Sequence, residues 1–217
     1  GSGKSTFLKL INRSIYPIKT NNSSIKLFDN ENINIWNLRK KIGFFFKDME
    51  ERVNNNVTLY DLIISGFSGT FNSRYSGFLS EKENKKISYL INQWELDNII
   101  NKEFKSLSDG QKRRGLIARA LVYEPNLLVL DEPFCNLDIK SNFILNKNLI
   151  NLMNKSVNIV YVTHNLESIL NMTNRVILIK QGRIINNGSP SKIMKSEIIS
   201  DLFQISINVI KQDHYWR

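Results

Sequence analysis

Short, largely apolar runs alternate with amphipathic stretches along most of this 217-residue chain. Residues 42–46, 127–130 and 158–163 form three such runs, with the length and lack of alternation expected of strands covered on both faces of a sheet. Residues 25–28 are a shorter strand candidate in an asparagine-rich stretch. Because helical stretches separate the runs, the pattern predicts an α/β fold with a parallel sheet flanked by helices.

The stretch between residues 48 and 114 has a different, mainly helical character. Thr58 is a candidate N-cap, and Ser80 with Glu83 matches the capping-box pattern. The helix after Ser80 has one apolar face, formed by Ile87, Leu90, Ile91 and Trp94. Residues 66–77, rich in Gly, Ser and aromatic side chains, are predicted to form a loop. We therefore expect residues 48–114 to form a helical subdomain inserted in one domain that spans the whole chain.

The second half of the chain contains further predicted elements. Residues 113–123 have a helical pattern that Pro125 prevents from continuing. The Gln-Gly pair at residues 181–182 is bracketed by two strand candidates, which predicts a hairpin and hence a small antiparallel part. Ser189 or Ser191 can begin the last helix.

Three side chains that can do chemistry follow the apolar runs directly. Asp131 and Glu132 come after residues 127–130, and His164 comes after residues 158–163. Parallel sheets bind ligands at the carboxyl ends of their strands, so we expect all three side chains at one edge of the sheet. The alternatives are two acids that only cap a helix and a histidine with a structural role.

The chain opens on Gly-Ser-Gly-Lys-Ser-Thr, which is typical of a phosphate-binding loop that runs into a helix. Glycines let backbone N–H groups approach phosphate oxygens, and the helix start adds the positive end of its dipole. The Lys4 ammonium would face the β- and γ-phosphates, and the Ser5 hydroxyl would bind the Mg²⁺ that bridges them. The expected nucleotide-binding residues are Gly1, Ser2, Gly3, Lys4, Ser5 and Thr6.

The full phosphate-loop pattern has another glycine three residues before Gly1. We therefore expect the N-terminal strands of the domain to be missing from this sequence. The alternative interpretation is that the opening glycines are a flexible or artificial start.

Composition narrows the classes of partner. Lys and Arg total 30 against 20 for Asp and Glu, a formal net charge of +10, which suits a polyanion, an acidic membrane surface or nucleotide phosphates. The basic residues are scattered, so no direct nucleic-acid contact is expected. The single cysteine, Cys135, excludes an internal disulfide and is interpreted as a space-filling residue; with only His164 and His214, no Cys/His metal cluster exists. Since no apolar run reaches about 18 residues, a membrane role would depend on a partner.

Taken in order, these features resemble the ATP-binding subunit of ABC transporters, and the resemblance covers nearly the whole chain. The matching motifs are the phosphate loop at residues 1–6, the Walker B strand and catalytic acid at 127–132, the D-loop at 136–138 and the switch histidine, His164. Residues 107–111, Leu-Ser-Asp-Gly-Gln, resemble the family's signature motif, Leu-Ser-Gly-Gly-Gln. The family binds ATP and Mg²⁺. Residues 49–66 and the C-terminal tail look most like the ATPases of molybdate and iron-siderophore importers.

The resemblance implies a role for each matched side chain. Asp131 would hold Mg²⁺ together with Ser5, and Glu132 would accept a proton from the water that attacks the γ-phosphate. His164 would hydrogen-bond the γ-phosphate. The residues expected to contact ATP bound to an opposing subunit are Ser108, Gly110, Gln111 and Asp138. A homodimer, or a heterodimer with a related subunit, would thus enclose two ATP molecules. Without the family, Ser108 is simply an N-cap.

Two positions depart from the family pattern. Asp109 stands where the family usually has glycine, which is tolerable if its side chain points away from phosphate. Lys47 falls where the family has the Q-loop glutamine, and an ammonium has no acceptor with which to bind a metal. Asp48 could substitute after a one-residue shift, or Lys47 could pair with phosphate directly.

We therefore expect an ATP-hydrolysing subunit that dimerises on ATP, drives a transmembrane permease and lies peripherally on the cytoplasmic side of a membrane. One alternative is a soluble, non-transport ABC ATPase that acts on nucleic acid or ribosomes. Another is a degenerate subunit that binds ATP without turnover.

Overall fold

The computed structural model describes residues 2–18, 20, 24–71, 77–212 and 215–216. The chain folds as two compact units. One comprises residues 19–161, and the other combines residues 1–18 with residues 162–217. In the described part of the chain, every helix is too short or too polar to span a bilayer.

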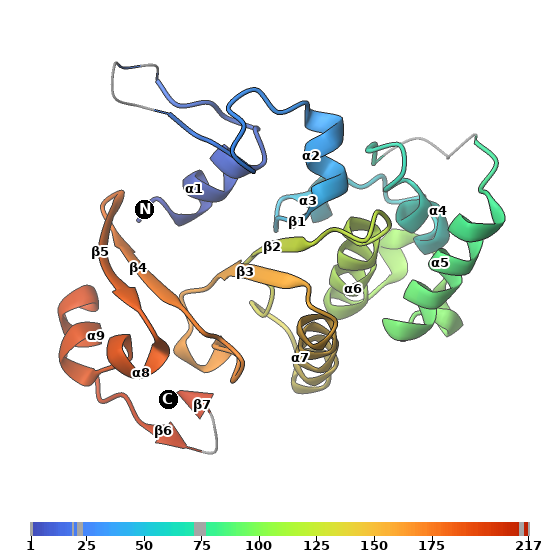
Figure 1. Ribbon diagram of the computed structural model, residues 1–217. Coiled ribbons are helices and arrows are strands. Elements are labelled where there is room, and N and C mark those ends of the chain that lie inside the picture. Colours follow the sequence, from blue (N-terminus) through green and yellow to red (C-terminus); the bar gives the residue numbers. More distant parts are fainter. Residues whose placement is uncertain (1, 19, 21–23, 72–76, 213–214, 217) are drawn as a thin grey trace. The chain divides into compact units, whose positions relative to one another are not determined.

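A parallel sheet organises the unit formed by residues 19–161. Its strands are β1 (Ile42–Phe45), β2 (Leu127–Asp131) and β3 (Asn158–Val162), which lie side by side in that order (Figure 1). β1 and β2 are parallel, with Ile42 opposite Leu127. Phe45 and Leu128 are fully buried, as expected of strands covered on both faces. The predicted parallel strands are thereby confirmed.

The third strand is more exposed than predicted. β3 forms where expected, but its residues are half-buried or exposed, and 43% of Val160 is exposed. In the described sheet, β3 is last in the strand order, so only β2 flanks it. The prediction that residues 158–163 are buried on both faces is therefore wrong. Strand order alone does not explain the difference, since β1 is also at an end of the order and is mostly buried. Helices at residues 35–41 and 109–120 pack against β1, and burial of a strand depends on such covering helices.

Helices pack around this sheet and extend away from it. They are α2 (Ile35–Lys41), α3 (Met49–Arg52), α4 (Leu59–Ile64), α5 (Glu81–Gln93), α6 (Asp109–Ala120) and α7 (Ile139–Asn154), with single 3₁₀ turns at Asp97–Ile99 and Phe104–Ser106. α2 and α6 pack against β1, and α4 packs against α6. Trp94 and Phe104 are fully buried in this unit, so the prediction that Trp94 is a core residue is confirmed. The predicted N-cap, Thr58, accepts a hydrogen bond from the Asp61 amide at 3.1 Å.

The capping box predicted before α5 is present. The Ser80 Oγ accepts a hydrogen bond from the Glu83 amide at 3.3 Å, and a Glu83 carboxylate oxygen accepts from the Ser80 amide at 2.8 Å. Because Ser80 donates to this carboxylate from both its side chain and its backbone, the pKa of Glu83 lies below its ordinary value. The capping box therefore contributes its full stabilisation to folding above the ordinary pKa of a glutamate carboxyl. That stabilisation is lost as the pH falls through the lowered pKa of Glu83.

We expect Ser80→Ala to lower the free energy of unfolding by about 1 kcal/mol at neutral pH, since the substitution leaves helix N–H groups unsatisfied. Urea unfolding followed by circular dichroism measures this. The difference from the unmodified chain should shrink in acid as Glu83 protonates. A Ser80→Ala penalty that stays constant below the carboxyl range would show that the charged box contributes nothing.

Two predicted boundaries in this unit are wrong. Residues 25–28 do not form a strand; Leu27 and Asn30 instead exchange two backbone hydrogen bonds around Phe28 and Asp29, both at positive φ, so the chain turns back at once. The helix predicted at 113–123 begins earlier and ends earlier, because Ser108 caps it and Leu121 is its C-cap, whose amide donates to the carbonyl of Ala118. The predicted loop at residues 66–77 falls partly outside the described residues.

The second unit combines the first helix with the C-terminal part of the chain. It contains α1 (Lys4–Ile11), a 3₁₀ turn (Leu166–Ser168), β4 (Val176–Lys180), β5 (Arg183–Gly188), α8 (Pro190–Ile193), α9 (Ser196–Phe203), β6 (Lys211–Gln212) and β7 (Tyr215–Trp216). The hairpin is confirmed: β4 and β5 pair antiparallel around residues 181–182, both at positive φ. The hydrophobic core of this second unit contains Leu178, Ile199 and Trp216.

The predicted single last helix is in fact two helices. Ser189 precedes α8, which ends at Ile193. Lys195 is extended, and α9 begins at Ser196. The Ser196 Oγ accepts a hydrogen bond from the Val209 amide at 3.0 Å, so the start of α9 is tied to the tail and not to α8.

Candidate nucleotide site

The phosphate loop leads into α1 as predicted. Gly3 is the N-cap of α1 and has a φ of 91°, a backbone conformation that favours glycine. The Lys4 ammonium donates a hydrogen bond to the Ser2 Oγ at 2.9 Å, so it lies over the loop. The Ser2 carbonyl accepts from the Gly182 amide at 3.0 Å, which ties the loop to the turn of the β4–β5 hairpin.

These contacts give the loop the features of an anion site. Ser5 and Thr6 lie exposed on the first turn of α1, while Leu8 is fully buried and anchors the helix. The first amides of a helix and its positive dipole end attract negative charge. Gly1, also predicted to bind nucleotide, lies outside the described residues.

The two predicted acids stand where β2 ends. Asp131 is the last residue of β2 and is 8% exposed, whereas Glu132 is half-buried. Glu132 has a φ of 50°, and Asn136 further along the same turn has a φ of 57°. Both are left-handed conformations, which are uncommon for glutamate and more frequent for asparagine. We call residues 132–136 the catalytic turn, because it contains Glu132, the residue that the sequence predicts to be the catalytic base.

A buried arginine lies under the catalytic turn. Arg113 on α6 donates from Nη1 to the carbonyl oxygens of Pro133, at 2.9 Å, and Cys135, at 2.6 Å. From the sequence, Arg113 was only the first residue of a helix, and its role was missed. The one available signal was a charged side chain next to the helix positions expected to face inward. Cys135 is half-buried, and its space-filling role stays a prediction.

The signature segment begins α6 with a second capping box. The Ser108 Oγ accepts from the Gln111 amide at 3.3 Å, and the Gln111 Oε1 accepts from the Ser108 amide at 3.0 Å. Capping uses only an acceptor lone pair of Ser108, so its hydroxyl proton can still be donated to a phosphate oxygen. Gly110 is buried, and a Cβ there would overlap Ser141 at the start of α7. Asp109 is exposed in the first turn.

Asp138, the D-loop acid, caps α7. Its two carboxylate oxygens accept from the Ser141 amide, at 2.9 Å, and from the Ser141 Oγ, at 2.6 Å. These hydrogen bonds lower the pKa of Asp138. Since Ser141 also lies against Gly110, the signature segment and the D-loop meet in the structure.

The turn after β1 contains Lys47 and Asp48, the two residues considered for the position of the Q-loop glutamine. Lys47 is exposed, directly after the buried Phe46. The Asp48 carboxylate instead receives the guanidinium of Arg52 at 2.6 Å, one helical turn along α3. Asp48 therefore already has a cationic partner, which argues against it as a substitute for the glutamine.

His164 follows β3 by two residues and is exposed, at the rim of a shallow depression whose walls include Phe203 and Ile207. No cluster of His, Cys, Asp or Glu large enough to form a complete metal cage is found among the described residues. Mg²⁺ does not need one, because it usually keeps water and phosphate ligands and takes one or two protein oxygens. The Asp131 carboxylate and the Ser5 hydroxyl are oxygen donors of that kind.

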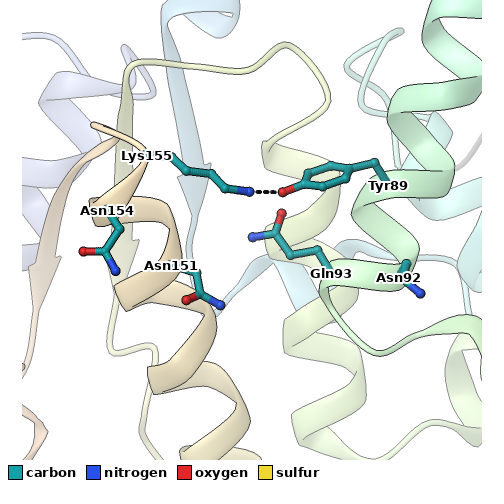
Figure 2. Close-up of a pocket in the computed structure, with 6 residues that line it drawn as sticks. All are labelled: Tyr89, Asn92, Gln93, Asn151, Asn154 and Lys155. Atoms are coloured by element: carbon teal, nitrogen blue, oxygen red, sulfur yellow. Dashed lines mark hydrogen bonds between the residues drawn. The ribbon is translucent and has the colours of Figure 1, made fainter.

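A separate polar depression lies between α5 and α7 (Figure 2). It is lined by Tyr89, Asn92, Gln93, Asn151, Asn154 and Lys155, and the Lys155 ammonium hydrogen-bonds the Tyr89 hydroxyl across it. None of these residues belongs to a predicted motif, so this depression is distinct from the predicted nucleotide-binding residues.

Comparisons of the sequence and of the structure with known proteins point to the same family. The family described as ABC transporter matches residues 1–135. An uncharacterized ABC transporter ATP-binding protein of Lactococcus lactis, YmeB, is 30% identical over 215 residues, which cover 96% of this chain and 80% of the relative.

Two solved structures share the fold. One is cbiO1 from Clostridium perfringens, part of the ABC transporter complex cbiONQ, with a TM-score of 0.73, 28% identity and coverage of 92% of this chain and 78% of the other. The other is an ATP-binding cassette solved as a dimer in a post-hydrolysis state with ADP and Pi, with a TM-score of 0.68, 25% identity and coverage of 87% and 81%. The chain therefore belongs to the ABC transporter family, as an ATP-binding subunit.

Proposed function

We propose that the chain hydrolyses ATP with the residues that its motifs place at strand ends and helix starts, and that it passes the resulting conformational change to a permease. The observation that carries this proposal is the agreement of motif order with local structure. The phosphate loop starts a helix, the Walker B acids end a buried strand, and the signature serine caps α6. Each is the local setting that the chemistry requires.

The proposed chemistry is the transfer of the γ-phosphoryl group to water. Lys4 neutralises charge on the β- and γ-phosphates, Glu132 accepts a proton from the attacking water, and His164 hydrogen-bonds the γ-phosphate. Asp131 and Ser5 would hold Mg²⁺, which would supply positive charge to the triphosphate. Catalysis then rests on positioning and charge stabilisation, with no covalent enzyme intermediate.

Dimerisation is the second part of the proposal. Ser108, Gly110, Gln111 and Asp138 would face ATP held by an opposing subunit. Ser108 and Asp138 are exposed, and the signature segment and the D-loop lie together, which supports one shared contact surface. A related cassette has been solved as a dimer with ADP and Pi. We propose a homodimer or a heterodimer with a related subunit, closed by ATP.

We further propose that the subunit docks peripherally on a transmembrane permease at the cytoplasmic side of a membrane. Among the proteins similar to this chain, cbiO1 is part of a transporter complex, which favours a transporter over a nucleic-acid ATPase. Residues 48–114, which contain α3, α4 and α5, are proposed to act as a helical subdomain. The similarity to molybdate and iron-siderophore importers stays a prediction.

Co-purification tests the proposed partner. The tagged full-length subunit, extracted in mild detergent from the membranes of its own cells, should bring down a multi-spanning membrane protein, and the complex should hydrolyse ATP. Recovery of the subunit with RNA or ribosomes and without a membrane protein would overturn the transporter assignment. ATP binding without turnover by the complex would instead support the binding-only alternative.

A further inference from the structure

One buried cation connects the catalytic turn with the segment that follows β1. Arg113 is 2% exposed, and its guanidinium bonds to two segments distant in sequence. Nη1 donates to the carbonyls of Pro133 and Cys135, while Nη2 and Nε lie 3.3 and 3.4 Å from one carboxylate oxygen of Glu50. All three nitrogens of the planar guanidinium are thereby engaged.

The two carbonyl contacts constrain the direction of the Glu132 side chain. Glu132 and Asn136 both hold left-handed backbone conformations. This conformation is uncommon for glutamate, so contacts that stabilise the turn matter most at Glu132. Within the turn, the Cys135 amide donates to the Glu132 carbonyl at 3.3 Å. The contacts of Arg113 with residues 133 and 135 therefore fix the turn on both sides of its middle residue, from the protein interior.

The Glu50 contact links the same guanidinium to the turn after β1. Glu50 lies on α3, and its amide donates to the Lys47 carbonyl at 3.3 Å. Its side chain is only 19% exposed, so its ion pair with Arg113 is poorly screened by water. A shift of α3 would carry Glu50 with it and so disturb the guanidinium beneath the catalytic turn.

We propose that Arg113 is a positioning residue that sets the geometry of Glu132 and couples it to the Lys47 segment. The inference rests on the proposed role of Glu132 as the base. Arg113 contacts the backbone of the turn and acts only through it. This chain has Lys47 where family members have the Q-loop glutamine, and the Glu50–Arg113 pair links the Lys47 segment to the catalytic turn.

The neighbouring residue supplies a matched control. Arg114 lies on the same helix, is also buried, and also donates to two backbone carbonyls, those of Trp94 and Glu95, at 2.8 and 3.2 Å. Those carbonyls lie at the end of α5 and not in the catalytic turn. Arg114→Lys should therefore disturb buried packing on the same helix without moving Glu132, and it keeps the positive charge that acts on Asp138.

The test compares steady-state ATP hydrolysis of the full chain, in complex with its partner where it has one. Arg113→Lys keeps the positive charge but cannot serve both carbonyls and Glu50 at once. We expect kcat to fall by about tenfold to a hundredfold, as for a catalytic group misplaced by about 1 Å. The affinity for ATP, measured for Arg113→Lys in a Glu132→Gln background so that ATP is not consumed, should stay nearly constant. The control variant Arg114→Lys should have the kcat of the unmodified chain.

Glu50→Gln tests the coupling separately and remains informative if Arg113→Lys does not fold. The amide oxygen can still accept from Arg113, but the ion pair is gone, so we expect a smaller fall in kcat. The double variant should be non-additive with the single ones, because both changes act on one contact.

An unchanged kcat in both Arg113→Lys and Glu50→Gln would overturn the inference. So would equal falls in Arg113→Lys and Arg114→Lys, since these would indicate a general packing effect. A Glu132→Gln variant that still turns over would contradict the proposed function itself, which is a different outcome from either of these.

Discussion

Glu132→Gln is expected to lower ATP turnover by about 10²- to 10⁴-fold while ATP binding persists. Glutamine has the same shape and fits the same left-handed position at the end of β2, but its amide cannot accept the proton of the attacking water. The measurement is phosphate release under saturating ATP, with nucleotide binding followed in parallel. The variant should also accumulate as an ATP-bound dimer, visible by size-exclusion chromatography with ATP.

Glu81→Gln is the control for this prediction. Glu81 is an exposed acid at the start of α5 that pairs with Lys85 on the helix surface, so its loss should leave turnover intact. If Glu132→Gln hydrolysed ATP at the rate of the Glu81→Gln control, another group would have to be the base, and the assignment of Glu132 would fail.

Lys4→Ala has the second largest expected effect, on ATP binding as well as turnover. The ammonium lies over the phosphate loop, against Ser2, and its charge would stabilise the triphosphate and the charge that develops on it. Removing one such preorganised group typically costs about 10²- to 10³-fold in rate. Equilibrium binding of a fluorescent ATP analogue, together with phosphate release, measures both losses.

A second lysine on the same helix makes this prediction specific. Lys9 is exposed in the last turn of α1, away from its N-terminal amides. Lys9→Ala should bind and hydrolyse ATP normally. Equal losses in the two variants would mean that α1 contributes only its fold or general positive charge, and ATP binding by Lys4→Ala at normal affinity would contradict the phosphate-loop assignment.

Several features were predictable because short segments of sequence encode them. The capping box at Ser80, the N-cap at Ser108, the hairpin at residues 181–182 and the apolar runs of β1 and β2 all formed. Each depends on hydrogen bonds or burial among residues within a few positions of one another. The site motifs are predictable for the same reason, since phosphate loops and Walker B acids are short patterns.

Other features depended on contacts between distant segments. Residues 25–28 have strand-like composition, yet no neighbouring strand pairs with them in the described structure, and the chain turns back at Phe28. The exposure of β3, compared with the burial of β1, depends on which helices cover each strand, and no local pattern encodes that. In both cases tertiary packing decided the structure, since packing can override the strand preference of a short segment.

Arg113 shows this division most clearly. The string of charges at residues 112–114 indicates only a polar helix start, because the buried or exposed face of a helix cannot be read from charged residues alone. Its acceptors, Glu50, Pro133 and Cys135, come from two other parts of the chain, and folding brings them together. The local sequence thus determined which chemical groups the site contains. The tertiary structure decided that Arg113 is buried beneath Glu132 and paired there, because only a folded core can pair such a charge away from water.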